Sequence, residues 1–410
     1  MRTGGASKAG LWPKRPAVGI AIAAAICVAL PASSAGQAAD TASRCGAAKI
    51  RTASGCTSRP AARRHVKEIV KQTVGEQGLR AALVRVDTGD RTLATASPGE
   101  SIAGVPANLR MHFRIGAIAI PYVIDLVLQL QDKGRLSLDD PVSKWLPDLP
   151  NADRVTLRML ASVTSGYPDW IQGNPDFLDT LHANVFRQWT TQELVDVAFG
   201  QPLICDPGEC FHYAHTDFVI LGRVVQAITG KPVGRLLRKR VFGPLRLRHT
   251  DISALPKIPA PVLHSYTSER GPYEDSTFWS PSWTIAKDMI ATGTIADVIK
   301  SAKAVGTGAL ISRKASRERI APITAGFPGF SRSLYYGLGI NVANTWQFQN
   351  PQLNGYTAIS AYLPSRKISL ALAVTRRAAA AATDTNYSEV LFAQIADYLA
   401  PNHPVVLPSG

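Results

Sequence analysis

The fold of this chain is decided by one stretch, Phe113-Arg-Ile-Gly-Ala-Ile-Ala-Ile-Pro-Tyr-Val-Ile-Asp-Leu-Val-Leu-Gln-Leu-Gln-Asp-Lys-Gly134. Apolar residues recur in it at the spacing of a helix, and Gly134 follows them as a stop signal. These apolar residues are Ile120, Val123, Ile124, Val127, Leu128 and Leu130. Because they cover most of the circumference, we predict a largely buried helix in the middle of a domain. Pro121 suits only a first helical turn, so we expect the helix to begin near Ala119 or Ile120.

This stretch resembles the segment that carries the nucleophile in the serine β-lactamase and D-Ala-D-Ala peptidase family. In that family Phe-Arg-Ile-Gly is followed by Ser-x-x-Lys, and the serine attacks an amide or ester carbonyl. Here Ala117 and Ile120 occupy the two positions. Alanine has no oxygen to acylate and isoleucine cannot take a proton, so the resemblance predicts that the family's covalent chemistry is absent. No serine stands three residues before a lysine, and the nearest case, Thr284-Ile-Ala-Lys287, is interpreted as a helix start.

A second stretch, Pro207-Gly-Glu-Cys-Phe-His-Tyr-Ala-His-Thr-Asp-Phe218, resembles the family's Pro-Gly-x-x-Phe-x-Tyr-Ser-Asn-Thr-x-Tyr. There the Tyr helps to move protons and the Asn binds the substrate amide. Tyr213 keeps the family residue, whereas His215 replaces the asparagine. We expect Tyr213 to pack its ring and to point its hydroxyl into a cleft. His215 is expected to be structural, and the alternative is an acid or base that works near neutral pH.

The third family motif, Lys-Thr-Gly or His-Thr-Gly, lies on the strand that edges the cleft, a few residues before a Gly-aromatic pair. Counting back from Gly355-Tyr356 places it at Gln349-Asn-Pro351. An amide thus replaces the basic or imidazole group, and a proline removes a ladder donor. We therefore predict no catalytic residue. The family motif positions are occupied by Ala117, Ile120, Tyr213, His215, Gln349 and Pro351.

The hydroxyls of Thr156-Leu-Arg-Met-Leu-Ala-Ser-Val-Thr-Ser-Gly166 offer a possible replacement nucleophile. This stretch resembles the family's short helix and loop that end in Thr-Ser-Gly. We expect Ser162, Thr164 and Ser165 to cap and turn the backbone. The alternative is a serine hydrolase, whether a peptidase, an esterase or a β-lactamase-like enzyme, that uses a displaced nucleophile such as Ser165 with His215 as its base.

The resemblance covers residues 61–400 and implies an α/β (α+β) fold. It predicts a five-stranded antiparallel sheet flanked by N- and C-terminal helices, formed by 61–112 and 300–400, and a helical insert over 113–299. The residues themselves predict a helix over 61–77, a hairpin over 79–96, strands over 334–342, 355–363 and 368–375, and a helix over 386–399. The start of the last helix, Asn-x-x-Glu, is typical of a capping box.

The N-terminus has the order of a secretory signal peptide. Four basic residues come first, an uncharged run over 17–30 follows, and small residues lead to Ala39. We predict a signal peptide over 1–39, a leader over 40–60 without periodicity, and a tail over 401–410. The run of 14 residues is short for a membrane span, and an uncleaved anchor is the alternative. The protein is expected to be exported to the cell envelope or secreted.

The net charge of the chain indicates which class of partner it attracts. The net charge is +15, and about +11 remains without the predicted signal peptide. A basic exported protein is drawn toward anionic envelope polymers or lipid headgroups, although a solvated surface without a specific partner is equally compatible. We expect a cell-wall peptide, a glycan or another anionic envelope component as partner. We expect no nucleic acid, and membrane contact only through the signal segment.

Four cysteines remain beyond the predicted signal peptide, in two local pairs. In an exported chain this predicts the disulfides Cys45–Cys56 and Cys205–Cys210. The alternative is a metal site built from Cys205, Cys210, His212 and His215. We expect no metal and no cofactor. The sequence thus predicts a catalytically inactive relative of the penicillin-recognising serine hydrolases that binds a component of the envelope.

Overall fold

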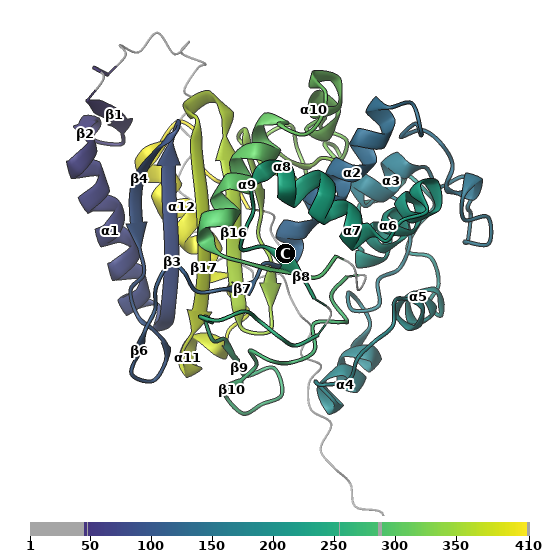
Figure 1. The fold of residues 1–410 in the computed structure, drawn as a ribbon, viewed down its shortest axis with the longest axis horizontal. Coiled ribbons are helices and arrows are strands. Elements are labelled where there is room, and N and C mark those ends of the chain that lie inside the picture. Colours follow the sequence, from purple (N-terminus) through teal and green to yellow (C-terminus); the bar gives the residue numbers. More distant parts are fainter. Residues whose placement is uncertain (1–44, 47, 254, 286–288, 408–410) are drawn as a thin grey trace, which may run out of the picture.

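The computed structural model describes residues 45–46, 48–253, 255–285 and 289–407. The predicted signal peptide lies outside them. Figure 1 shows a sheet with helices on both faces beside a second part made mostly of helices. Within the described residues, none of the helices has the length and apolar character needed to cross a membrane.

One antiparallel sheet organises the first part. Its strands lie in the order β12-β13-β14-β16-β17-β3-β4, and β15 also pairs with β16. Four of the predicted strands are present as β3 (Leu79–Thr88), β4 (Arg91–Ala96), β16 (Tyr356–Leu363) and β17 (Ile368–Arg376), and β14 (Trp346–Gln349), which the sequence did not predict, pairs with β16. Three short strands add to them: β12 (Leu334–Tyr336), β13 (Asn341–Ala343) and β15 (Gln352–Leu353). The α/β fold is therefore confirmed, with a larger sheet than the five strands predicted.

The single strand predicted over 334–342 was wrong. The chain turns back between β12 and β13, which pair with each other. Gly339 in this turn has a φ of +64°, and a Cβ there would lie 2.5 Å from a methylene of Ile124. Only glycine combines this backbone conformation with so close an approach to the central helix.

Side chains alternate along the central strand and give the sheet two cores. In β17, Leu370, Leu372 and Val374 pack under α1 (Arg59–Glu76) and α12 (Tyr387–Leu399). The intervening Ala371 and Ala373 belong to the other core, where α9 (Ile295–Thr307) crosses the sheet. The first and last helices thus share one face, as predicted (Figure 1).

The capping box predicted for α12 was wrong. The side chain of Asn386 does not cap the helix, and its amide donates instead to the carbonyl oxygen of Asn350 at 2.9 Å. The carboxylate of Glu389 accepts from the side-chain amide of Asn350. Asn350, in the loop after β14, therefore binds the side chains of both Asn386 and Glu389, which a capping box would use at the start of the helix.

The leader contains secondary structure that its sequence pattern did not indicate. Strands β1 (Lys49–Thr52) and β2 (Gly55–Ser58) form an antiparallel hairpin. The disulfide Cys45–Cys56 closes it, which confirms this predicted pair. Ser58 then caps α1 by accepting from the N–H of Ala61 at 3.4 Å.

Helix α2 (Ile120–Asp132) is the axis of the helical part. Its first turn contains Pro121, as predicted, and a short 3-10 turn η1 (Gly116–Ala119) precedes it. Buried side chains of α2 meet α6 (His215–Thr229) and α7 (Val233–Leu237). The remaining helices are η2 (Val142–Lys144), α3 (Leu157–Ser162), α4 (Pro175–Ala183), α5 (Thr191–Phe199), the π-helix η3 (Arg238–Phe242), α8 (Gly243–Leu245), α10 (Arg313–Arg319), η4 (Pro364–Arg366) and α11 (Ala378–Ala381).

Short strands connect the two parts. β7 (Phe113–Arg114), β8 (Asp251–Ile252) and β11 (Ala291–Gly293) form a small sheet directly before η1. Two further pairs are β5 (Glu100–Ile102) with β6 (Val105–Pro106), and β9 (Tyr266–Thr267) with β10 (Glu274–Asp275). Because β7 is held by β11, the η1 turn has a fixed starting point at the junction of sheet and helices.

Candidate functional site

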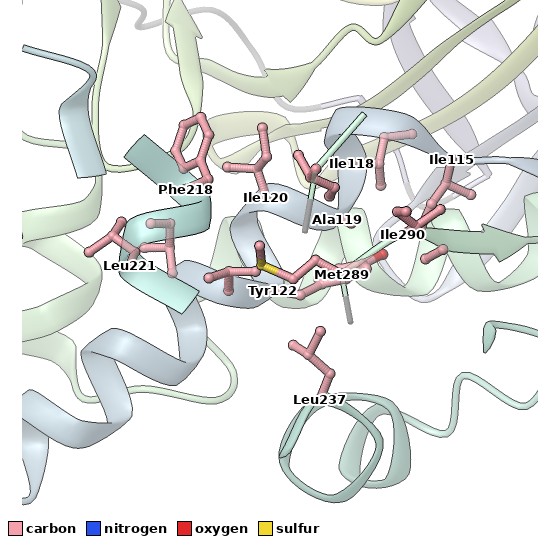
Figure 2. Packing of buried hydrophobic residues seen from close by; sticks show 14 of the residues in the cluster. Ile115, Ile118, Ala119, Ile120, Tyr122, Phe218, Leu221, Leu237, Met289 and Ile290 are labelled. Atoms are coloured by element: carbon pink, nitrogen blue, oxygen red, sulfur yellow. The ribbon is translucent and has the colours of Figure 1, made fainter. Parts of the chain in front are cut away.

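The position of the family nucleophile lies in the η1 turn. Ala117 is half-buried there, while Ile118, Ala119 and Ile120 are buried in the apolar cluster shown in Figure 2. Gly116 has a φ of +50°, and a Cβ on it would lie 2.7 Å from the Cβ of Pro351. The structure therefore brings the first and third predicted motif positions into contact.

Ile120 and Gln349 both face the interior. Ile120 is only 1% exposed, and Gln349 is 3% exposed. The amide of Gln349 donates to the carbonyl oxygen of Gly339 at 2.7 Å, so its donor is directed into the protein. A small cavity behind these residues is lined by Ile118, Pro121, Tyr122, Gln347, Gln349 and Ser360, among others.

Pro351 interrupts the strand at the edge of the site, as its missing N–H predicts. β14 ends at Gln349 and β15 begins at Gln352. The carbonyl oxygen of Pro351 still accepts from the N–H of Ala358 at 3.0 Å. The strand edge beside Ala117 is thus altered without a complete loss of pairing to β16.

Tyr213 is half-buried just before α6. Its ring centroid lies 5.3 Å from that of His215, 6.1 Å from Phe218 and 6.3 Å from Tyr336. Burial raises the pKa of Tyr213 well above its ordinary value, and Tyr336 and Asp169 raise it further. The phenol is therefore protonated at neutral pH and does not act as a base.

His215 forms a pair with Asp169 that the sequence did not indicate. Its Nδ1 lies 3.0 Å from Oδ2 of Asp169, which is 0% exposed on its side chain. Burial would raise the pKa of Asp169, but His215 and the backbone N–H groups of Gln172 and Ile171 together lower it below its ordinary value. The ionised carboxylate only accepts, so Nδ1 carries a proton; in the neutral form of such a ring, Nε2 is an acceptor.

Comparisons with known proteins identify the family of this chain. Residues 66–394 match the family described as beta-lactamase. The chain belongs to the β-lactamase family. A putative penicillin-binding protein, PbpX of Bacillus subtilis, is 24% identical over 258 residues, which are 62% of this chain and 59% of that protein. Penicillin-binding protein 4 of Amycolatopsis lactamdurans is 37% identical over 153 residues, 36% of this chain and 38% of that protein.

The chain thus matches between about two fifths and three fifths of the length of these two β-lactamase family relatives. Solved structures extend the likeness over most of the fold. D-amino acid amidase from Ochrobactrum anthropi, in complex with L-phenylalanine amide, has a TM-score of 0.71 at 23% identity. That comparison covers 82% of this chain and 97% of the amidase, and it establishes the β-lactamase fold.

Ser165, the hydroxyl considered as a displaced nucleophile in this β-lactamase family member, is 2% exposed. It donates to Oδ1 of Asp217 at 2.6 Å and accepts from the N–H of Tyr167 at 3.0 Å. Burial raises the pKa of Asp217 well above its ordinary value, and the charge of Asp169 adds to the rise. Ser165 therefore donates its proton to a buried carboxyl whose pKa is raised, while His215 directs its Nδ1 to another carboxylate.

The disulfide Cys205–Cys210 supports the loop that carries Ser165, and it confirms the second predicted pair. Around it, Gly166 accepts from the N–H of Ile204 at 2.9 Å, and Thr164 accepts from the N–H of Gly208 at 2.8 Å. Both sulfurs are bonded to each other, so the alternative metal site loses its two thiolates. Among the described residues, no group of three or more His, Cys, Asp or Glu is arranged to hold a metal ion.

Three features of the site escaped the sequence analysis: Asp169, Asp217 and the aromatic contacts of Tyr213. The signal for Asp169 was its place after Pro168, because an aspartate in such a turn accepts from the N–H groups two and three residues on, as it does here at 2.7 and 2.9 Å. Thr284, considered with Lys287 as a helix start, lies in a turn and donates to the carbonyl oxygen of Pro281. Lys287 lies outside the described residues.

Proposed function

We propose that this β-lactamase family protein is a non-catalytic binding protein of the cell envelope. One observation carries the proposal: the turn that presents the family nucleophile offers the methyl group of Ala117, and the position of its general base holds the buried Ile120. Acyl transfer by the family mechanism needs an oxygen at the first position and a proton acceptor at the second.

The nearby hydroxyls support the same interpretation. Burial raises the pKa of Tyr213, which favours its protonated form, and Ser165 is only 2% exposed. A nucleophilic serine needs an accessible oxygen and a base within hydrogen-bond reach, whereas the buried Ser165 donates to Asp217 and His215 pairs with Asp169.

We infer a cell-wall peptide as the ligand, because the relatives include proteins named for penicillin binding. His215 stands at the position where the family binds the substrate amide. Its side chain is 18% exposed, and its Nε2 is suited to accept from a peptide N–H.

A hydrolase remains the second candidate function because of the Asp169–His215 pair. A carboxylate on Nδ1 orients the imidazole and strengthens Nε2 as a base. The contacts of Ser165 count against that serine as its nucleophile, so such an enzyme would have to activate water.

The test uses a peptide that ends in D-Ala-D-Ala. We expect calorimetry to detect saturable binding and chromatography to detect no release of D-alanine. His215→Ala should weaken binding about tenfold, whereas His264→Ala should not change it. The control is matched, because His264 also forms a His–Asp pair, with Asp275 at 2.9 Å, and neither residue is one of the motif positions. Release of D-alanine by the wild type would overturn the non-catalytic proposal, and unchanged binding by His215→Ala would overturn the role of the imidazole.

A further inference from the structure

The helical part carries a run of positive charge that the site does not use. Between Phe218 and Thr250 the chain has eight Lys and Arg residues and no Asp or Glu. The middle of this stretch forms α7, η3 and α8, and Figure 1 shows α7 and α8 far from α1. A segment of this length without a single acidic residue is uncommon in a protein with 30 of them.

Most of these cations have no partner. Arg238 is neutralised by Asp251 at 2.9 Å. By contrast, the exposed side chains of Lys231, Arg235, Lys239 and Arg246 make no ion pair or hydrogen bond with any described residue. Arg248 is exposed in the same way. Unpaired cations that stand close together repel one another, so this surface is stabilised by any anion that comes between them.

Three of these cations are evenly spaced along the chain. Arg235 in α7 and Lys239 in η3 are four residues apart, so their Cα positions follow one another at about 6 Å along this helical stretch, and Lys231 stands four residues earlier, just before α7. At one end Arg135 reaches the carbonyl oxygen of Ile228 at 3.1 Å and adds its charge. We call this set the basic face, and it consists of Arg135, Lys231, Arg235, Lys239, Arg246 and Arg248.

The basic face lacks the exposed apolar and aromatic side chains that a membrane interface or a single-stranded nucleic acid would contact. The exposed large hydrophobic residues in the described part of the chain are Val105, Phe186, Ile204, Leu255, Phe278 and Val406, and all lie on other elements. Insertion into a membrane interface uses such apolar side chains, and binding of single-stranded nucleic acid uses exposed aromatic rings. Four of the six cations are arginines, whose planar forks fit phosphate oxygens with two hydrogen bonds.

We propose that the basic face binds a flexible, linear, phosphate-bearing polymer. The proposal is independent of the proposed function, because the basic face shares no residue with the site around Ala117. Its chemistry is that of counterion release, in which each phosphate contact frees bound cations and makes the affinity depend on salt.

The test measures binding of long-chain sodium polyphosphate at several concentrations of sodium chloride. The variant Lys231→Gln/Arg235→Gln/Lys239→Gln should bind at least about tenfold more weakly at 0.1 M salt. The slope of log affinity against log salt should fall by about 2, since each contact contributes roughly 0.7 for a flexible strand. All three side chains are exposed, so thermal melting should match the wild type.

The control variant Arg64→Gln/Lys67→Gln/Lys71→Gln removes one arginine and two lysines from the exposed face of α1. It has the same net charge as the test variant, and its affinity should stay within about twofold of the wild type. Equal weakening by both variants would show attraction by net charge alone and overturn the proposal. Tighter binding to anionic lipid vesicles or to duplex DNA than to polyphosphate would overturn the choice of partner.

Discussion

Ala117 and Ile120 differ in how they fill the site. Ala117 is half-buried beside Gly116, whose Cα approaches the ring of Pro351. Ile120 belongs to the buried cluster, and its methyl group lies 3.0 Å from where a Cβ of Gly339 would stand. The first position is thus partly open to solvent, whereas the second is packed with apolar atoms.

We predict that Ala117→Ser/Ile120→Lys will not restore acylation. The new lysine would be surrounded by apolar atoms, where desolvation favours its neutral form and lowers stability by several kcal/mol. Gln349 and His215 would not supply the family's contacts to a substrate. We expect a lower melting temperature than that of the parent and no label from fluorescent penicillin on a denaturing gel. Strong labelling of the double variant would show that only the nucleophile and base had been lost.

The raised pKa of Asp217 makes the stability of the folded protein depend on pH. Its pKa is raised in the folded protein by burial, so its contribution to stability is complete below the unfolded pKa of about 3.9 and is lost as the pH rises toward the folded pKa. Asn cannot ionise and can still accept from Ser165. Asp217→Asn should therefore melt like the wild type at pH 4 and higher than the wild type at pH 7.5. A melting temperature that falls below the wild type at pH 7.5 would contradict the raised pKa.

At the scale of the element, helix α2 contains a charge that its apolar pattern concealed. Asp125 is 2% exposed and forms an ion pair with Arg319 of α10, which is 1% exposed. Arg319 also donates to the carbonyl oxygen of Val305 at 3.3 Å. The pair therefore connects α2, α9 and α10 within the helical part.

We predict that Arg319→Met will destabilise the protein by about 3–5 kcal/mol, because it leaves Asp125 buried without a partner. The double variant Asp125→Leu/Arg319→Met should recover most of that loss, since neither charge is then buried. Urea denaturation measures both. If the single and double variants were equally unstable, the loss of stability would come from packing and not from the unpaired carboxylate.

Local sequence signals explain which elements could be predicted. Pro121 located the start of α2, and the two cysteine pairs located both disulfides. The capping box of α12 failed because Asn350, which lies far away in sequence, takes the side chains of Asn386 and Glu389. A local sequence pattern cannot show that a residue far away in the chain will bind the same side chains.

The same limit applies to the candidate site at the scale of the whole molecule. The resemblance placed the third motif on the strand that edges the cleft, and Pro351 of this motif lies against Gly116, the residue before Ala117. The partner of His215 is 46 residues away and the partner of Ser165 is 52 residues away, so only the fold brings them together. Burial, which sets the pKa values of Tyr213 and Asp217, is likewise a property of the folded chain.

The whole molecule combines two surfaces of different chemistry. The site lies where the sheet meets the helical part, and its altered positions come from both parts. The basic face is formed by α7, η3 and the segments beside them, together with Arg135 after α2, and contains none of these positions. Both surfaces are consistent with the proposal that this protein binds ligands and does not catalyse acyl transfer.

Intact-mass spectrometry tests the central claim most directly. The protein beginning at Asp40 is incubated with fluorescent penicillin or with a fluorophosphonate, and a penicillin-binding protein that acylates is present as a positive control. We predict that the control gains the mass of one adduct and that this chain keeps its unmodified mass with both reagents, because Ala117 has no oxygen to acylate. A stoichiometric adduct on this chain, mapped to Ser165 or to any other hydroxyl, would contradict the account and identify the protein as a hydrolase with a displaced nucleophile.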